Sequence, residues 1–451
     1  MGEEVTSAIS SGDTAWVLTS AALVMLMLPG LALFYGGMTR AKSTLNMMMM
    51  VFGALFLVSI LWVFYGFSMF YGTSQGGFIG DPTEFFGLES LMATTDPEAI
   101  IPDMSFVAFQ ALFAAITVAL IAGAIADRAK FATWMVFGGV WATLVYFPVA
   151  HWVWGGGWIG EGTFLLSPFT EDGTGVIDFA GGTAVHINAG AAALALVFVL
   201  GKRLGWPKTP MKPHNLTLVM LGAGLLWFGW FGFNAGSELA ADNATAVVFM
   251  NTIVATAAAA LAWLVVEKIR DGHATSLGAA SGVVAGLVAI TPACASVTPI
   301  GAIILGVVAG VLCALAVGLK YKLGYDDSLD VVGVHLVGGL VGTLMIGFIA
   351  TDVAPTAANG LFYGGGFNQL IVQTIGALSV MVYAFVMAWI IGKILDVTMG
   401  FRVDEDEEVA GVDLITHGES AYELNSTGGG GKFAGVGQAA AEKSEKEGAS
   451  A

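Results

Sequence analysis

The chain has 451 residues, of which 56% are apolar and 11% are charged, and its formal net charge is -17. Charged residues make up about a quarter of ordinary soluble domains, so the composition excludes a soluble enzyme, a disordered chain and a collagen-like chain. The acidic balance, with no basic patch, argues against nucleic acid as a partner. The two cysteines, Cys294 and Cys313, cannot form a disulfide framework.

Eleven apolar segments are each long enough to cross a bilayer, whose core takes about 20 helical residues. They cover residues 14–38, 46–71, 104–126, 131–154, 179–201, 215–237, 244–266, 275–292, 297–318, 331–352 and 366–399. The expected fold class is therefore an all-α polytopic membrane protein with eleven transmembrane helices.

The basic residues divide the chain into two sides. All 17 Lys and Arg lie after an odd-numbered span, near the end of the eleventh span or in the C-terminal tail. By the positive-inside rule, the N-terminus is outside and the C-terminus is cytoplasmic. The outer segments carry Asp and Glu instead. We interpret this as a solvated acidic surface, with concentration of a cation at the outer mouth as the alternative.

Five is an odd number, so spans 1–5 and 6–10 run in opposite directions and can form a 5+5 inverted repeat, with the eleventh helix left over. The pairs Asp178…His186 on span 5 and Asp330…His335 on span 10 suggest this symmetry. Their spacings differ, being eight residues in the first pair and five in the second.

His186 and His335 are the exceptions in spans that are almost free of ionisable side chains. Such groups are costly in a membrane and indicate function by default, although each histidine alone could simply bond to a neighbouring helix. A neutral imidazole offers one donor and one acceptor, so a pair in a narrow apolar pore could pass a small hydrogen-bonding molecule or a proton. The predicted boundaries alone do not bring the two rings into contact.

A second group of candidates gathers at the outer level of the spans and comprises Phe113, Trp154, Phe233 and Ser237. Aromatic rings are common at every membrane interface. The functional interpretation is a cation site, because ring faces attract a small cation and a hydroxyl oxygen accepts its hydrogen bond. No zinc-protease, serine-hydrolase or phosphate-loop motif is present, which argues against a membrane enzyme.

Several segments together resemble the ammonium transporter family (Amt/Mep/Rh), and its prokaryotic Amt type in particular, from about residue 14 to 424. They are PGLALFYGG at 29–37, VAFQALFAAITVALIAGAIADR at 107–128, AHWVWGGG at 150–157, DFAGGTAVHINA at 178–189, WFGFNAGS at 230–237, TPAC at 291–294 and DVVGVH at 330–335. The resemblance implies two inverted five-helix halves and a homotrimer with one pore per subunit.

The resemblance also implies roles for single residues. Phe113, Trp154 and Ser237 match an outer ammonium recruitment site, near which the Asp178 carboxylate acts indirectly. Phe113 and Phe233 match a stacked phenyl gate, and His186 and His335 match twin histidines that share a hydrogen bond. Positions that line or border the pathway are Gln110, Leu31, Phe34, Tyr35, Trp230 and Val331. No catalytic residue, metal or cofactor is implied.

The function implied is recruitment of ammonium, its deprotonation, and conduction of ammonia past the histidines, with or without separate proton transfer. An ammonium sensor that signals through its cytoplasmic face is the alternative. The expected partners are ammonium, the lipid bilayer, two further copies of the chain and a cytoplasmic PII-type regulator. The expected parts are an extracellular segment 1–13, a transporter domain 14–400 in the cell membrane, a regulatory segment 401–427 and a disordered tail 428–451.

Overall fold

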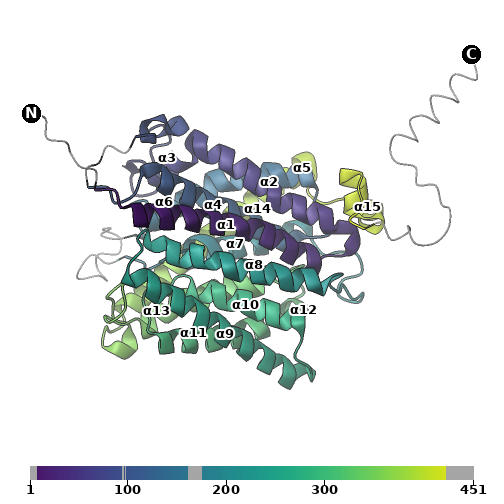
Figure 1. Cartoon of the computed structure of the whole chain (residues 1–451). Coiled ribbons are helices and arrows are strands. Elements are labelled where there is room, and N and C mark those ends of the chain that lie inside the picture. Colours follow the sequence, from purple (N-terminus) through teal and green to yellow (C-terminus); the bar gives the residue numbers. More distant parts are fainter. Residues whose placement is uncertain (1–7, 94–95, 97, 161–174, 423–451) are drawn as a thin grey trace, which may run out of the picture.

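The structure, a computed structural model, describes residues 8–93, 96, 98–160 and 175–422. Its helices lie side by side and run between two opposite ends of the molecule (Figure 1). Within the described residues, ten helical segments are long and apolar enough to cross a membrane, and Ser276–Ile290 is a shorter apolar helix. These eleven segments correspond one to one with the predicted spans. The predicted disordered tail 428–451 lies outside the described residues.

The first half of the bundle contains the five spans up to residue 200. Its helices are α1 (Ser11–Met38), η1 (Ala41–Ser43), α2 (Thr44–Leu61), η2 (Trp62–Gly66), α3 (Phe67–Tyr71), α4 (Asp103–Ile121), η4 (Ala122–Ile125), α5 (Phe131–Trp141), η5 (Ala142–Tyr146), α6 (Phe147–Trp154), η7 (Gly182–Ile187) and α7 (Asn188–Leu200). Between α3 and α4 lie a two-stranded antiparallel hairpin, β1 (Ser74–Gln75) and β2 (Ile79–Gly80), and η3 (Phe86–Leu91).

The second half contains the remaining spans and the C-terminal segment. Its helices are α8 (Leu216–Ala235), η8 (Gly236–Glu238), α9 (Asn243–Asp271), α10 (Ser276–Ile290), α11 (Pro299–Ala316), α12 (Leu319–Leu323), η9 (Val332–Leu336), α13 (Val337–Ile349), η10 (Leu361–Tyr363), α14 (Asn368–Met399), α15 (Glu405–Ala410) and η11 (Asp413–His417).

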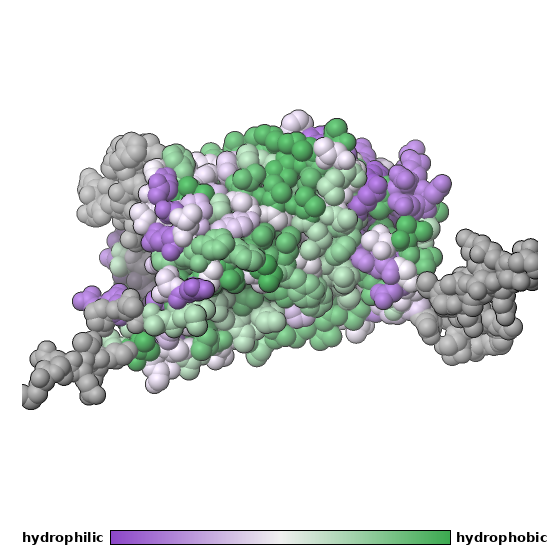
Figure 2. Space-filling model, turned by 90° about the horizontal axis from the view of Figure 1, so that it is seen from above, coloured by the Kyte–Doolittle hydropathy of each residue, from purple (hydrophilic) through white to green (hydrophobic). Residues whose placement is uncertain are grey.

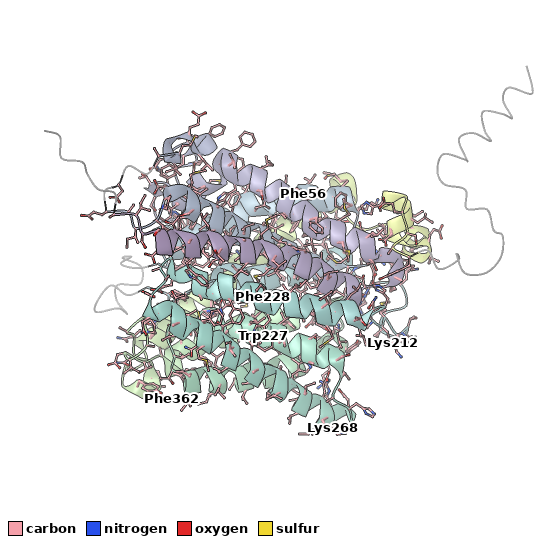
Figure 3. All side chains as sticks on the ribbon, viewed as in Figure 1. Phe56, Lys212, Trp227, Phe228, Lys268 and Phe362 are labelled. Carbon is pink, nitrogen blue, oxygen red and sulfur yellow. The ribbon has the colours of Figure 1, made fainter. Side chains whose placement is uncertain are left out.

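The surface has the polarity of a membrane protein. Figure 2 shows a hydrophobic belt across the middle of the face in view, with hydrophilic residues gathered at its two ends. Large apolar side chains are exposed on the bundle, among them Phe56 at 59% and Phe228 at 56%. Such exposure is unfavourable in water but suits contact with lipid tails. Lys212 and Lys268 lie at the same end of the bundle as the C-terminal segment (Figure 3).

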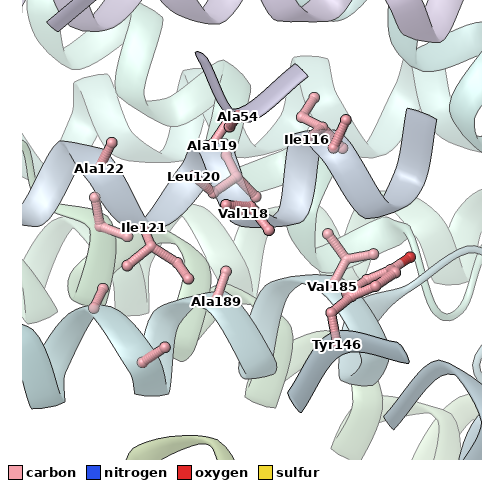
Figure 4. Close-up of a cluster of buried hydrophobic side chains, with 14 of the residues drawn as sticks. Ala54, Ile116, Val118, Ala119, Leu120, Ile121, Ala122, Tyr146, Val185 and Ala189 are labelled. Atoms are coloured by element: carbon pink, nitrogen blue, oxygen red, sulfur yellow. The ribbon is translucent and has the colours of Figure 1, made fainter. Parts of the chain in front are cut away.

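The two halves meet along α1 and α8, the first span of each half, and these two helices pack against each other along their length. Small residues permit this approach: a Cβ at Gly222 of α8 would lie 2.4 Å from the backbone nitrogen of Phe34 on α1. Inside the first half, small and branched apolar side chains such as Ala119, Val185 and Ala189 fill the space between α4 and α7 (Figure 4).

The C-terminal segment packs against the loop between α1 and α2 and against the start of α2. The Glu408 carboxylate is buried and pairs with Arg40 at 3.4 Å and Arg402 at 2.8 Å. The Asp413 carboxylate accepts hydrogen bonds from the N–H groups of Leu45 and Asn46 at the start of α2. The segment therefore binds the chain's own loops.

A buried ionic cluster fixes the loops at the same end. The Arg203 guanidinium lies between the carboxylates of Asp127 at 3.0 Å and Asp326 at 2.8 Å. Arg128, also buried, donates to the carbonyls of Ala124 and Asp326. These contacts join the loops that follow α4, α7 and α12.

Candidate functional site

His186 and His335 meet at the centre of the bundle. Each lies in a single π-helical turn, η7 or η9, at the start of the last span of its half, and such turns often occur at functional sites. Their Nδ1 atoms are 3.2 Å apart, so one ring donates to the other. The ring planes are inclined by 21°, and both residues are buried. The predicted shared hydrogen bond is confirmed.

Asp178 determines where the first of these turns begins. Its Oδ1 accepts hydrogen bonds from the N–H groups of Gly181 and Gly182 at 2.9 and 2.6 Å. Its Oδ2 accepts from those of Thr183 and Ala184 at 2.8 and 2.9 Å. The first N–H groups of a helix have no partner within the helix. This carboxylate is the acceptor for four such groups. Both of its oxygens are therefore engaged by backbone.

The counterpart of Asp178 in the second half is Asp327, and the pairing with Asp330 suggested by the sequence is wrong. Asp327 accepts from the N–H groups of Val331 and Val332 at 3.1 and 2.8 Å, and it precedes His335 by the same eight residues that separate Asp178 from His186. The Asp330 carboxylate instead accepts a hydrogen bond from the Lys320 ammonium, with which it forms an ion pair at 2.6 Å.

Asp330 corresponds to Gly181, which follows Asp178 by the same three positions. Both residues have a positive φ, 117° at Gly181 and 64° at Asp330. Aspartate tolerates this left-handed conformation better than most residues with a side chain. The two halves thus repeat one local structure, an acidic cap, a left-handed residue and a π-helical turn with a histidine, and this repetition supports the predicted inverted repeat.

A small enclosed cavity adjoins the histidine pair, with a volume of about 10 Å³, roughly the room that one water molecule needs. It is lined by Met27, Leu31, Phe34, Ile116, Leu120, Val185, His186, Leu226, Trp230, Phe233, Val284 and His335. Apart from the two imidazoles and one indole, every side chain of this set is a hydrocarbon or a thioether. Six of these twelve residues were not predicted from the sequence, although Met27 shares the helical spacing of Leu31 and Phe34 on α1.

One imidazole nitrogen is free to bind what enters this cavity. The Nε2 atom of His186 is buried and has no hydrogen-bond partner among the described residues. The His186 ring lies against the Trp230 indole, with centroids 5.4 Å apart and planes inclined by 17°. Trp230 is held in turn, because its Nε1–H donates to the Thr291 hydroxyl at 2.8 Å. The stack fixes the orientation of the imidazole.

The predicted aromatic candidates lie next to the histidines, with the ring centroids of Phe233 and His186 6.1 Å apart. The rings of Phe113 and Phe233 are stacked, with centroids 4.1 Å apart, and both are buried. Trp154 stands perpendicular to Phe113 at 6.3 Å, and its Nε1–H donates to the backbone carbonyl of Asp178 at 2.8 Å. The Ser237 hydroxyl donates to the Phe233 carbonyl at 2.8 Å, which leaves its oxygen lone pairs available to accept. The structure therefore brings the predicted group together.

Tyr35 and Val331 both pack against Gly123 of η4. A Cβ at Gly123 would lie 2.6 Å from the Tyr35 ring and 2.8 Å from the Val331 side chain. The Tyr35 hydroxyl donates to the Leu120 carbonyl at 3.0 Å. Gln110 lies half-buried on α4, one turn from Phe113, and does not line the cavity.

Charged groups stay at the ends of this pathway. No cluster of His, Cys, Asp or Glu in the described part of the chain could hold a metal ion. An open cavity of about 380 Å³ at the Ser237 end is lined by residues that include Glu238 and Asp242. Anionic side chains thus lie at that end and none lines the cavity beside the histidines.

Comparison with known sequences identifies relatives of the whole chain. Residues 15–422 match the Ammonium Transporter Family. An ammonium transporter of Mycobacterium tuberculosis is 54% identical over 442 residues, covering 92% of this chain and 90% of the relative. An ammonium transporter of Bacillus subtilis is 44% identical over 415 residues, covering 91% of this chain and 98% of the relative.

Comparison with solved structures gives the same architecture. The crystal structure of Candida albicans Mep2 superimposes with a TM-score of 0.80 and 35% identity, covering 90% of this chain and 89% of that chain. A Sensor Amt Protein superimposes with a TM-score of 0.81 and 29% identity, covering 90% of this chain and 98% of that chain. The predicted eleven-helix membrane fold is therefore confirmed.

Proposed function

The chain belongs to the ammonium transporter family, whose members are transporters and not enzymes, and on this premise we propose how it moves its substrate. Ammonium is recruited at Trp154, Phe113 and Ser237, loses a proton there, and crosses the bundle as ammonia past His186 and His335. The observation that carries this proposal is the hydrogen-bonded histidine pair beside a cavity that is otherwise almost entirely hydrocarbon.

Recruitment follows from the geometry of the outer group. A small cation is attracted to the faces of Trp and Phe rings, most strongly to Trp, and the two rings here stand at right angles. The Ser237 oxygen adds an acceptor for one N–H of the ion. Asp178 contributes indirectly, because its oxygens are saturated by backbone. It orients the carbonyl that receives the Trp154 N–H and places a negative charge nearby.

Selectivity follows from desolvation. Ammonium and potassium carry the same charge and bind rings similarly, so the outer site alone cannot separate them. Below it, stacked Phe113 and Phe233 close the path and the cavity offers no carbonyl or carboxylate cage. Burying an ion without such partners is very costly. Ammonium escapes this cost by leaving its proton behind, and potassium cannot.

The histidine pair then handles a neutral, hydrogen-bonding molecule. The free Nε2 of His186 can accept from ammonia or donate to it, depending on the tautomer. The bond between the two Nδ1 atoms also offers a path along which a proton could follow separately. The residues that line or border the pathway in this proposal are Leu31, Phe34, Trp230, Tyr35, Val331 and Gln110.

Current measurement in proteoliposomes tests the mechanism. After an ammonium jump the wild type should carry a current that an equal potassium jump does not produce. The double substitution His186→Ala with His335→Ala should abolish the current or its selectivity. His273→Ala, at an exposed histidine outside the bundle interior, is the matched control and should retain both. Equal currents for the double variant and the control would refute the assignment of the pair.

An ammonium sensor is the second candidate, supported by the similarity to a Sensor Amt Protein and by the C-terminal segment that packs on the inner loops. A pH-sensitive dye inside the same liposomes distinguishes ammonia conduction from a sensor that does not transport. A pH change without a current indicates neutral ammonia conduction. Neither signal from correctly folded protein indicates a sensor.

The remaining parts of the proposal concern assembly and orientation. The protein is a homotrimer in the cell membrane, with residues 1–13 outside and the regulatory segment 401–427 in the cytoplasm. Segregation of Lys and Arg to one side supports this orientation. A cytoplasmic PII-type regulator would bind that basic side. Thiol labelling of cysteines placed at residues 9 and 420 of a variant without native cysteines tests the orientation from outside intact cells.

A further inference from the structure

The residue that ends the fourth span and a residue near the end of the ninth span make the same backbone contact. Trp154 is the last residue of α6 and donates its Nε1–H to the backbone carbonyl of Asp178 at 2.8 Å. Lys320 lies in α12, and its ammonium donates to the backbone carbonyl of Asp327 at 2.9 Å. Asp178 and Asp327 are the equivalent caps of the two halves. Lys320 therefore holds in the second half the position that Trp154 holds in the first.

A second contact supports this equivalence. A Cβ at Gly181, the left-handed residue of the first half, would lie 3.4 Å from the Trp154 ring. Asp330, the left-handed residue of the second half, accepts a hydrogen bond from the Lys320 ammonium at 2.6 Å. The tryptophan thus faces a residue without a side chain, and the lysine faces a carboxylate. Two contacts match between the halves, so the pairing of Trp154 with Lys320 does not depend on residue spacing.

The two positions lie at opposite ends of the bundle. α12 lies toward the end that carries α15, and α6 lies toward the other end (Figure 1). Asp326, next to the second cap, pairs with Arg203 in the ionic cluster at the α15 end. Val331, which borders the proposed pathway, donates its N–H to the Asp327 carboxylate at 3.1 Å. In the proposed orientation, Lys320 therefore lies beside the inner end of the pathway, as the recruitment site lies beside the outer end.

The Lys320 ammonium fills its position as a free ammonium ion would. It carries the same charge and has three N–H donors, and it contacts the Asp327 carbonyl and the Asp330 carboxylate. Lys320 is 7% exposed, whereas the Asp330 side chain is 23% exposed. The carboxylate can thus be reached from outside the bundle but is already neutralised. A second cation at this place would be repelled by the first.

We propose that Lys320 is a tethered ammonium group that occupies the inner counterpart of the recruitment site. It prevents that end from recruiting ammonium or potassium, whereas the Trp154 face and the Ser237 oxygen leave the outer site open to a free cation. Lys320 is thus a specificity-determining residue for the side from which cations bind. The inference rests on the proposed recruitment function and orientation. It extends them by explaining how an inverted repeat gives two different ends.

Uptake into oriented membrane vesicles tests the inference, because right-side-out and inside-out vesicles present the two ends separately. The probe is isotope-labelled ammonium, and initial rates are corrected for vesicles without the protein. Lys320→Met frees the Asp330 carboxylate, so the inner KM should fall about tenfold, as expected for one hydrogen bond to a charged group. The outer KM should stay as in wild type. Lys322→Met, at an exposed lysine two residues away, is the matched control and should change neither KM.

The maximal rate distinguishes a new binding site from structural damage. Because a passive pathway does not change the equilibrium between the two sides, tighter binding at the inner end lowers the inner KM and the inner maximal rate by the same factor. Damage to the fold lowers the maximal rate without lowering KM. Adding Asp330→Asn to Lys320→Met removes the carboxylate and should restore the wild-type inner KM. Lys320→Arg keeps a tethered cation and should also retain that KM.

Two results would overturn the inference: an unchanged inner KM in folded Lys320→Met, or an inner KM that stays low after Asp330→Asn is added. If Lys320→Met does not fold, judged by gel filtration, Lys320→Trp replaces it. This variant copies the outer residue Trp154 and can donate to the same carbonyl, so it should likewise lower the inner KM, and an unchanged value would refute the inference. Wild-type vesicles that take up no ammonium from either side would instead refute the proposed function on which the inference rests.

Discussion

Replacing the two acidic caps by asparagine should destabilise the protein unequally, in proportion to the hydrogen bonds that each carboxylate accepts. Asp178 accepts four backbone N–H bonds and Asp327 accepts two. Asparagine keeps one carbonyl oxygen and presents an NH₂ group where the second oxygen was. Asp178→Asn therefore leaves two buried N–H groups facing a donor, and Asp327→Asn leaves one.

The magnitude follows from the energy of each bond. A hydrogen bond to a charged group contributes about 1.5–3 kcal/mol, so the losses are about 3–6 kcal/mol for Asp178→Asn and about half that for Asp327→Asn. Because Asp178 also fixes the start of η7, transport should fall with stability. The assay is the free energy of unfolding in mixed micelles, followed by tryptophan fluorescence. An Asp178→Asn loss equal to or smaller than that of Asp327→Asn would refute the capping argument.

Three further changes probe the packing around the site and the C-terminal segment. Gly190→Ala should abolish most transport, because the new Cβ would lie 2.5 Å from the backbone nitrogen of Leu336 and force η9 and its histidine away; retained ammonium current would contradict this. Glu408→Gln should lower stability by about 1–3 kcal/mol, less than a fully buried pair because its arginine partners are one quarter exposed, and limited proteolysis should then cut residues 401–422 faster than in wild type. Burial raises the pKa of Asp326, but the hydrogen bonds and charge of Arg203 outweigh it and hold that pKa below its usual range. This stabilisation is present above the unfolded pKa of about 3.9 and is lost as pH falls through the folded pKa, so wild-type melting temperature should drop more steeply below pH 4 than that of Asp326→Asn.

The sequence predicts the spans and the histidines because both signals are local. A run of about 20 apolar residues needs no knowledge of its neighbours, and an imidazole within such a run stands out by its cost. The contact between His186 and His335 is different, because it depends on how two spans cross. Segment boundaries alone left the rings apart, and only the resemblance to a family predicted their hydrogen bond.

The error at Asp330 shows what a local pattern cannot supply. An aspartate close to a histidine looked like a repeat of the first half, yet the aspartate that caps the turn is Asp327. The equal spacing of eight residues was visible in the sequence. The role of Asp330, at the left-handed position of Gly181, was not, because glycine and aspartate share that conformation without sharing any chemistry.

The repeated caps also explain why the pathway can be both apolar and well ordered. A histidine in hydrocarbon would be free to turn away unless its backbone were fixed, and the cavity has few polar groups that could hold it. Here each capping carboxylate lies outside the cavity and positions its histidine through the backbone of η7 or η9. The charge that positions the histidines is thus kept apart from the space that must reject charge. Moving a carboxylate into that space would supply a partner for a cation and, with it, lower the barrier against potassium.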